Sequence, residues 1–554
     1  MKTKKMMALL LAGVMTASLL AGCGNKASGD GQSTASTAGN TKTSAGTQEN
    51  ADPGAADAPE VELSIMSWHG DNGETKYYKG LQYVMEAYTE AHPNVTFKYI
   101  QQPLDGYMDL LDTQFISGGA ADIIYMQPHM SRAFADKGVL LPLDEFMYAE
   151  SAYVPGKKWV ETFSGGEASF SSSKASNALG AIMFVPNDSS SSLSMGQPFF
   201  YNKDLFKQAG IDVLPTTFTE FLDALQKLKD AGINPVAGEF SDRHVSWSLG
   251  WISDQFGEHY IDQYFDDKYN GSDKVDLKAD KSAIALANGF LKADDPILVD
   301  ISNALYDYAQ YWQDGWTGAS YDEAKNLFLM QEAAIFQEGF WAFTQYQDLI
   351  TDFEWGVLPI PLVTKETSEF AMEGFMKPSG QQDSGFNVSK TVADDPDKLA
   401  AVIDFLQFLS SPEVQQKYID IAVTLSPVDG VTQPAEVEPF IFDTDLCIYE
   451  QSIGPNYVDY GDVGIWGGLS QEFLTGRIDT ATYNEKAIAN SMQTAINDCK
   501  DKLKTLPESI AETEKKLEDL KAEGAAEALL EAQQKSLDLL KLKLEMYQQY
   551  CSEL

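Results

Sequence analysis

The folded part of the chain opens with alternating apolar and polar residues. Residues 61–68 alternate with a period of two, which predicts a β-strand. Residues 77–92 instead carry apolar side chains at the spacing of one helical face, and His92-Pro93-Asn94 ends that helix. Residues 95–100 alternate again. A strand, a helix and a strand at this spacing predict a βαβ unit and therefore a parallel sheet.

The same pattern continues along the chain. It predicts helices over 105–117, 218–231 and 399–418, and strands over 122–126 and 353–359. Strands and helices that follow one another in this way predict an α/β fold.

The first residues carry the pattern of an export signal. Three lysines among the first five residues precede an apolar run over 6–20, which is too short for a stop-transfer helix. Leu20-Ala21-Gly22-Cys23 follows and resembles the bacterial lipobox, in which the cysteine is diacylated and becomes the mature N-terminus. We therefore expect residues 1–23 to be a lipoprotein signal; the alternative is a short transmembrane anchor.

Residues 24–60 consist mainly of small and polar residues, which cannot bury enough apolar surface to offset chain entropy. This composition predicts a flexible tether, with the folded body held by lipid at the extracellular face of the cytoplasmic membrane.

Composition and charge narrow the possible partners. The 554 residues are 44% hydrophobic and 11% aromatic, which is ample for a buried core. The formal net charge of −42 disfavours nucleic acid and anionic lipid headgroups. The three cysteines after Cys23 and the five histidines lack the spacings of metal sites, so we expect no metal and no cofactor.

Several segments, in a fixed order, resemble the extracellular solute-binding proteins of bacterial ABC importers, in the carbohydrate group that includes maltose-binding protein. They are 117–124 (SGGAADII) with 138–143 (GVLLPL), 200–206 (FYNKDLF) with 209–211 (AGI), 215–221 (PTTFTEF), 331–341 (QEAAIFQEGFW) and 405–415 (FLQFLSSPEVQ). The chain departs from that family at Phe218, usually a tryptophan, and at Gln331-Glu332, usually Gly-Lys. The stretch 164–176 and the tail after about residue 500 have no counterpart in short members of the family.

The resemblance implies a periplasmic-binding-protein type II fold, in which two α/β lobes joined by hinge crossovers close on a ligand. Lobe one would be 61–183 and 352–427, and lobe two 184–351 and 428–500. The site would lie in the cleft between the lobes, where strand ends meet.

Sugar binding asks for aromatic rings against the apolar faces of the sugar and for planar polar groups at its hydroxyls. Position along the predicted strands and crossovers selects the candidates, and Trp341 also aligns with the family's cleft tryptophan segment. We expect one of the two tryptophans at 247 and 251 to be a core residue, and a surface ion pair is the alternative role of Arg243. The predicted ligand-binding residues are Trp68, His69, Asp71, Gln127, Asp188, Asp242, Arg243, Trp247, Trp251, Glu338, Trp341 and Trp466.

The resemblance implies a monomeric protein that captures a carbohydrate of oligosaccharide size and delivers it to ABC permease subunits, without enzymatic activity. One alternative is a sensing protein whose loaded form docks a receptor. Another is a cell-surface glycosidase, which would need two carboxylates at a defined separation. With 82 acidic residues, some pair lies close by chance, so the acidic content does not separate these functions.

The C-terminal residues 501–554 carry two apolar heptad-like stripes that change register near Gly524, which predicts an antiparallel helical hairpin. Folding there would bring Cys499 and Cys551 together at the open end, where an oxidising compartment favours a disulfide. Pro507 could break the first arm, and two unpaired thiols are the alternative.

Overall fold

The computed structural model describes residues 59–554, with gaps at 71–75, 105, 171–173, 175–176, 178–179, 189–196, 241, 272–273, 275–276, 377–383, 442–443, 450–462 and 526. The chain divides into Met1–Pro53 and Gly54–Leu554, and every described residue belongs to the second unit. The predicted signal, Cys23 and nearly all of the predicted tether lie outside the described residues.

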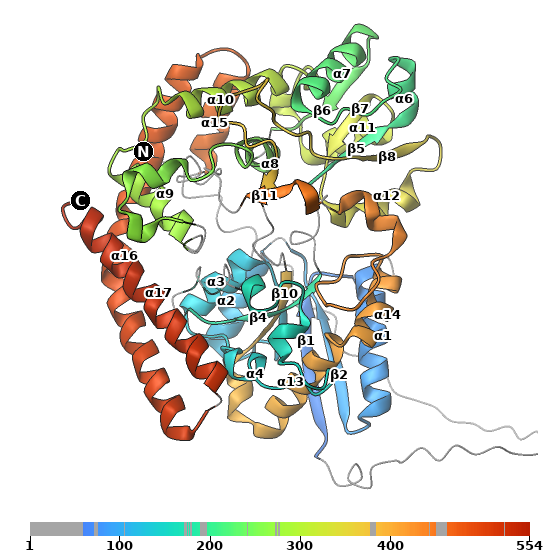
Figure 1. Cartoon of the computed structure of the whole chain (residues 1–554). Helices are drawn as coiled ribbons and strands as arrows, with labels where there is room; N and C mark the ends of the chain where they lie inside the picture. The colour runs from blue at the N-terminus through green and yellow to red at the C-terminus, as the bar shows by residue number, and fades with distance from the viewer. Residues whose placement is uncertain are drawn as a thin grey trace, which may run out of the picture. The chain divides into compact units, whose positions relative to one another are not determined.

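The first sheet has five strands in the order β2-β1-β3-β10-β4. The strands are β1 (Val61–Ser67), β2 (Val95–Gln101), β3 (Ile123–Met126), β4 (Phe184–Asp188) and β10 (Ser384–Val388). β1 pairs in parallel with β2 and β3, whereas β10 is antiparallel to β3 and β4. Helix α1 (Lys76–Ala91) connects β1 to β2, so the predicted βαβ unit is confirmed (Figure 1).

Both faces of the first sheet contribute side chains to a buried core. Leu63 and Ile65 of β1 join one core, which is covered by α1, α13 (Pro396–Leu409) and α14 (Pro412–Ala422). Met66, the next residue along β1, joins a different core with α2 (Tyr107–Ser117) and α3 (Pro128–Asp136). All three side chains are fully buried. The period-two alternation of a strand therefore feeds two cores, one on each face.

The second sheet has four strands in the order β6-β7-β5-β8. They are β5 (Phe199–Asn202), β6 (Asn234–Ala237), β7 (Ala333–Gln337) and β8 (Trp355–Leu358). Phe199 joins a core with α7 (Phe218–Asp230), α8 (Asp242–Ser253) and α10 (Pro296–Ala309), whereas Phe200 faces α11 (Tyr321–Leu329) and α12 (Phe343–Leu349). Two sheets, each covered by helices on both faces, confirm the predicted α/β class.

The predicted helix over 399–418 is wrong as a single element. It consists of two helices, α13 and α14, which meet at Ser410 and Ser411. Pro412 occupies the first turn of α14, where its missing N–H costs no helical hydrogen bond. The apolar stripe continues through both helices, which is why periodicity alone did not separate them.

The strand pairing also moves the predicted lobe boundaries. β4 belongs to the first sheet and β8 to the second. The chain therefore changes sheets between Asp188 and Phe199 and again between Leu358 and Ser384, rather than after residues 183 and 351. Alternation identifies a strand but not the sheet to which it belongs. The strands that pair with β4 and β8 lie more than a hundred residues away along the chain, and this pairing decides the sheet.

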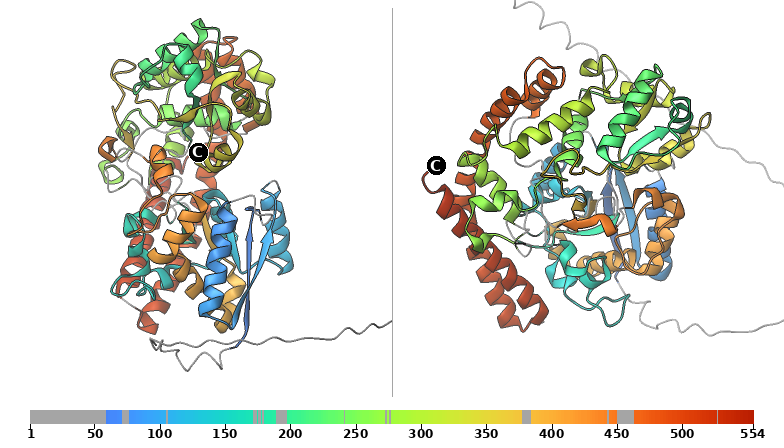
Figure 2. Two further views of the ribbon diagram at one scale, coloured as in Figure 1. Left: turned by 90° about the vertical axis from the view of Figure 1, so that its right-hand side faces the viewer. Right: turned by 45° about the horizontal axis from the view of Figure 1, so that its top comes forward.

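The C-terminal segment forms the predicted helical hairpin. Helix α16 (Thr480–Glu523) runs without a break through Pro507, and α17 (Glu527–Cys551) returns beside it (Figure 1; Figure 2, right). Gly524 ends α16 in the left-handed conformation, with a φ of 75°, which glycine adopts at little cost. The first arm begins well before residue 501, so the hairpin is continuous with the helical part of lobe two and is not a separate extension.

Other helices complete the two lobes. They are α4 (Asp144–Met147), α6 (Lys203–Gln208), α9 (Lys278–Ala287) and α15 (Val463–Leu474), and a short pair of strands is formed by β9 (Phe375–Met376) and β11 (Cys447–Tyr449).

The hairpin seam follows the predicted stripe. Leu506, Ile510, Leu517 and Leu520 of the first arm are buried. Thr513 fills the remaining seam position, and its hydroxyl donates to the carbonyl of Ser509 over 2.8 Å. Its polar group is thus satisfied within the helix, which explains how a threonine can occupy an apolar seam.

The structure places the thiols of Cys499 and Cys551 together at the open end of the hairpin. Both residues are buried and both are free thiols in the structure. A hydrogen bond with Cys551, together with burial, raises the pKa of the Cys499 thiol. The predicted proximity is therefore present, and the covalent bond itself stays a prediction.

We expect these two thiols to be oxidised to a disulfide in the mature protein. Labelling of thiols in denaturant, on the chain from residue 24 onward prepared without reductant, should then detect Cys447 alone. Detection of Cys447, Cys499 and Cys551 together would rule the bond out. Cys447→Ser is the control, because it should remove the single labelled thiol without changing the mass difference produced by reduction.

Candidate functional site

The ends of β1 and β3 place three predicted residues at one edge of the first sheet. Trp68 and His69 follow β1, and Gln127 follows β3; all three are half-buried. Because these two strands are parallel, their carboxyl ends lie at the same edge, where ligands of α/β proteins bind. The Trp68 ring packs edge-on against Tyr125 of β3, with centroids 4.9 Å apart.

His69 has a defined orientation at this edge. Its ring stacks on Tyr77, with centroids 4.9 Å apart and an interplanar angle of 16°. Its Nδ1 lies 3.3 Å from the hydroxyl of Ser67, and the Tyr99 hydroxyl donates to its carbonyl over 2.7 Å. Burial lowers the pKa of His69 to about 4, so the imidazole is neutral at pH 7. A neutral, fixed imidazole can hydrogen-bond to an uncharged ligand.

Tyr77 adjoins the candidate site, although its place on the apolar face of the predicted helix 77–92 predicts only a core residue. It lies at the start of α1, and its hydroxyl is 3.2 Å from the hydroxyl of Thr424. Helical periodicity predicts that Tyr77 is partly buried, but not that its ring lies on His69. That contact depends on where α1 lies relative to the end of β1.

Trp341 has the most exposed aromatic ring among the predicted residues whose side chains the structure describes. It lies in the short helix η7 (Phe340–Ala342) after β7 and is 45% exposed. Its ring packs edge-on against Trp247 of α8, with centroids 5.7 Å apart. A Cβ on Gly339 would come within 2.1 Å of the Trp341 indole, so only glycine leaves room for the ring there. Gly339 and Trp247 therefore hold an indole whose remaining surface is open to a ligand.

Glu338 stabilises the backbone next to Trp341. The prediction that Glu338 contacts ligand is not supported. Its side chain is fully buried. One carboxylate oxygen accepts a hydrogen bond from the N–H of Gly339 over 2.7 Å, and the other accepts a short hydrogen bond from the Tyr321 hydroxyl. Glu338 thus fixes the peptide on which Trp341 rests.

Two further residues of α8 are in the core. Trp251 is 7% exposed and packs against Phe199 and Tyr308, so its predicted ligand contact is wrong and it is the core tryptophan of the pair. His244 is fully buried against the ring of Trp312, with centroids 4.3 Å apart. Helix α8 lies between the second sheet and α10, so side chains on more than one of its faces are buried.

The remaining candidates stay predictions. Asp188 ends β4, Asp242 and Arg243 begin α8, and Trp466 lies in α15, but their side chains are not among those described. Asp71 lies outside the described residues.

Contacts between the lobes lie close to both His69 and Trp341. Lys76 at the start of α1 donates to Gln347 of α12 over 3.4 Å. Leu425, which follows α14 next to the Thr424 partner of Tyr77, joins a core with Phe340 and Phe440. Phe340 precedes Trp341 in η7. His69 of the first lobe and Trp341 of the second therefore both adjoin the junction between the lobes.

The described residues contain no group of three or more His, Cys, Asp or Glu side chains arranged to hold a metal ion. Within the same part of the chain, no helix combines the length and apolar character that a membrane crossing requires.

Comparison with known proteins identifies the family. The bacterial extracellular solute-binding protein family matches residues 72–416, which is more than half of the chain, so the chain belongs to that family. The multiple sugar-binding protein of Streptococcus mutans serotype c is 22% identical over 429 residues, covering 76% of this chain and 87% of that protein. The sn-glycerol-3-phosphate-binding periplasmic protein UgpB of Brucella abortus is 28% identical over 202 residues, covering 35% of this chain and 40% of that protein.

Solved structures show the same fold. A chitin oligosaccharide binding protein matches with a TM-score of 0.52 at 18% identity, covering 79% of this chain and 99% of that chain. RafE in complex with raffinose matches with a TM-score of 0.51 at 18% identity, covering 78% of this chain and 100% of that chain. The two-lobed α/β fold implied by the resemblance is therefore confirmed.

One departure from the family is accommodated by backbone strain. Gln331 stands where the family usually has glycine, and its φ of 61° is in the left-handed region. The turn before β7 is therefore kept, although the residue is not a glycine.

The lowered pKa of His69 predicts a specific pH response. Because its folded-state pKa of about 4 lies below the ordinary value of 6.5, the unfolded chain binds more protons between these values. The stability that His69 contributes is present above pH 6.5 and falls as the pH drops toward 4. An NMR titration should find the His69 ring neutral at about pH 5, and His69→Gln should lose less stability than the parent on acidification. A His69 titration near 6.5 would contradict this environment.

The different burial of the tryptophans predicts different stability costs. Trp251→Ala should lower the free energy of unfolding by about 3–5 kcal/mol, because it leaves a cavity in the core. Trp341→Ala should cost about 1 kcal/mol or less without ligand, because nearly half of the ring is already in water. Urea denaturation measures both. Equal costs would place Trp341 in the core and remove it from the site.

Proposed function

We propose that this protein captures a carbohydrate of oligosaccharide size between its two lobes and delivers it to the permease subunits of an ABC transporter. It does so as a monomer held to the extracellular face of the membrane by lipid on Cys23, and it does not hydrolyse its ligand.

The observation that carries the proposal is the exposed indole of Trp341, held by Gly339 and Trp247 at the junction of the lobes. A flat aromatic ring in a fixed position suits the apolar face of a pyranose. The neutral His69 on the first lobe offers a hydrogen-bonding group without a charge to desolvate. The names of the multiple sugar-binding protein and the chitin oligosaccharide binding protein point to the same ligand class.

Charge favours a neutral ligand over a phosphorylated one. The formal net charge of −42 opposes the approach of an anion. The similarity to a glycerol-3-phosphate-binding protein covers only 35% of this chain, so it weighs less than the sugar-binding relative, which covers 76%.

A thermal-shift screen tests the ligand class. Because a ligand that binds only the folded state raises the melting temperature, a panel of glycans of increasing length should contain at least one that does so. sn-Glycerol 3-phosphate and a mixed peptide pool serve as the competing classes. A shift with either of these and with none of the glycans would overturn the carbohydrate proposal, and release of shorter sugars from the bound glycan would overturn the non-enzymatic one.

Variants of the indole test its role. Trp341→Ala should abolish the glycan shift, and Gly339→Ala should weaken it strongly, because the added methyl displaces the ring. Tyr83→Ala is the matched control, since Tyr83 is also an exposed aromatic residue, 37% exposed, but lies on α1. Loss of the shift in Tyr83→Ala as well would mean that the variants act through general destabilisation.

A further inference from the structure

The C-terminal hairpin is rooted in the second lobe by buried polar contacts. Asp280 of α9 is 8% exposed and accepts a hydrogen bond from the Tyr547 hydroxyl over 2.8 Å and an ion pair from Lys543 over 3.0 Å. Lys543 is itself only 6% exposed. Paired charges that are this deeply buried are costly to separate, so α17 is firmly attached to α9.

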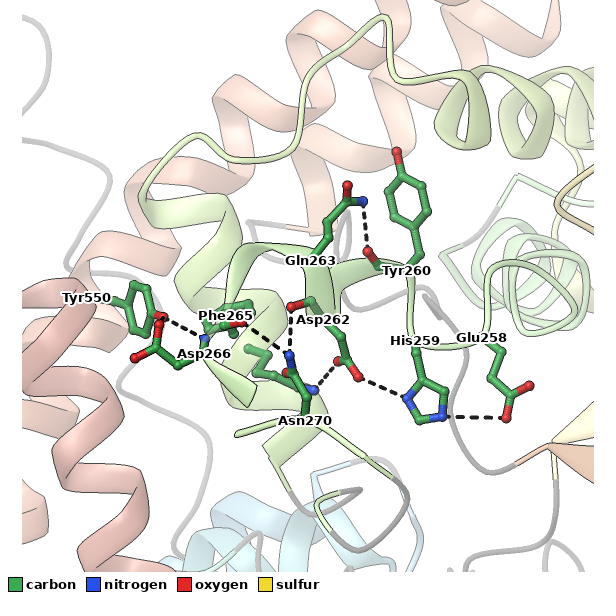
Figure 3. A network of polar contacts seen from close by, with 10 residues as sticks. Glu258, His259, Tyr260, Asp262, Gln263, Phe265, Asp266, Asn270 and Tyr550 are labelled. Carbon is green, nitrogen blue, oxygen red and sulfur yellow. Dashed lines mark hydrogen bonds and ion pairs between the residues drawn. The ribbon is translucent and has the colours of Figure 1, made fainter. Parts of the chain in front are cut away.

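The end of α17 adds a second group of contacts to the same lobe. The backbone N–H of Asp266 donates to the Tyr550 hydroxyl over 3.0 Å, and Gln549 donates to the Asp266 carboxylate over 2.9 Å. The Tyr550 ring packs edge-on against Phe265, with centroids 5.0 Å apart. Figure 3 shows that this contact continues into a polar network through Asn270 and Asp262.

The first arm is attached as well. In α16, Asn484 accepts a hydrogen bond from Ser302 of α10 over 2.6 Å, and Ala487 and Ala495 are fully buried in the core of lobe two. Both arms of the hairpin are therefore attached to lobe two.

The tip of the hairpin instead contacts lobe one. Leu520 of α16 and Leu529 and Ala532 of α17 are buried in the core that also contains Trp159 and Phe170 of the first lobe. Next to them, a Cβ on Gly180 would lie 3.3 Å from the Cβ of Ser536, so the two chains approach closely there. These apolar side chains would enter water if the tip left lobe one.

An ion pair lies at the rim of this tip contact. Lys535 of α17 is 3.6 Å from Glu167 in the short helix η2 (Gly166–Phe170). Both side chains are well exposed, so the pair orients the contact more than it stabilises it. The stretch 164–176 and the C-terminal hairpin both have no counterpart in short members of the family. In this chain the two contact each other through Glu167 and Lys535.

The hairpin is long and stiff enough to transmit force between its two attachments. From Ala532 at the tip to Tyr547 at the root, α17 spans about 22 Å at 1.5 Å per residue, and α16 packs along it. Two lobes of a binding protein can rotate relative to each other, whereas a helical pair attached to both lobes resists such rotation.

We propose that the hairpin is a strut between the lobes, which limits how far they rotate relative to each other. Its root is the contact of Asp280 with Lys543 and Tyr547, and its tip is the contact of Leu529 and Ala532 with lobe one. The strut does not depend on which ligand the protein binds.

Single-molecule energy transfer between the lobes tests the strut without ligand. Dyes attached through non-natural amino acids at Ile116 in lobe one and Val213 in lobe two, which are 88% and 82% exposed, leave the native cysteines in place. The parent should give a narrow distance distribution. Ala532→Glu, which places a charge in the tip contact, should broaden it about twofold. Gln534→Glu is the matched control, because it adds the same charge at an exposed position of α17. It removes only an exposed hydrogen bond to Asp538 and should leave the distance distribution unchanged.

A second variant separates loss of restraint from misfolding. Ser536→Leu adds bulk opposite Gly180 without burying a charge, and should broaden the distribution as well. Circular dichroism and melting curves establish that each variant is folded. Folded variants with the parent's distribution would overturn the strut. If both tip variants failed to fold while Gln534→Glu folded, the tip would be part of the core of lobe one, and the proposal would also be overturned.

Discussion

Helices pack against both faces of each sheet, and the other features of the fold follow from this packing. Consecutive residues of a central strand, such as Phe199 and Phe200, therefore belong to two different cores. Helices must cover every face, and they come from distant parts of the chain, as α13 and α14 do over the first sheet. Polar and partly exposed aromatic groups are thereby left to the strand ends, which is where His69 and Trp341 lie.

Neighbouring side chains hold the two aromatic rings of the candidate site, those of His69 and Trp341, in fixed positions. Glu338 is buried beneath Gly339, Gly339 lies against the Trp341 indole, and Trp247 closes its edge. On the other lobe, Tyr77 holds the ring of His69. Rings fixed in this way lose little conformational entropy on binding, which favours recognition of a weakly polar ligand.

The hairpin uses the scarce basic residues of an acidic chain. Lys543 of α17 is buried against Asp280 of α9. Lys281, which follows Asp280 in α9, is fully buried beside Asp262. In a chain with 82 acidic and 40 basic residues, cations placed at the root of the hairpin offset local repulsion where the helices meet.

Local periodicity and glycine's backbone freedom were enough to predict the α/β class, the first βαβ unit, the turn at Gly524 and the two apolar stripes of the hairpin. The segment that resembles the family also pointed to Trp341. Long-range packing, in contrast, places β4 in the first sheet and β8 in the second, contrary to the predicted lobe boundaries. It also buries Trp251 and Glu338 and stacks Tyr77 on His69. These outcomes depend on partners far away along the chain, and a residue's local pattern carries no information about which distant surface will cover it.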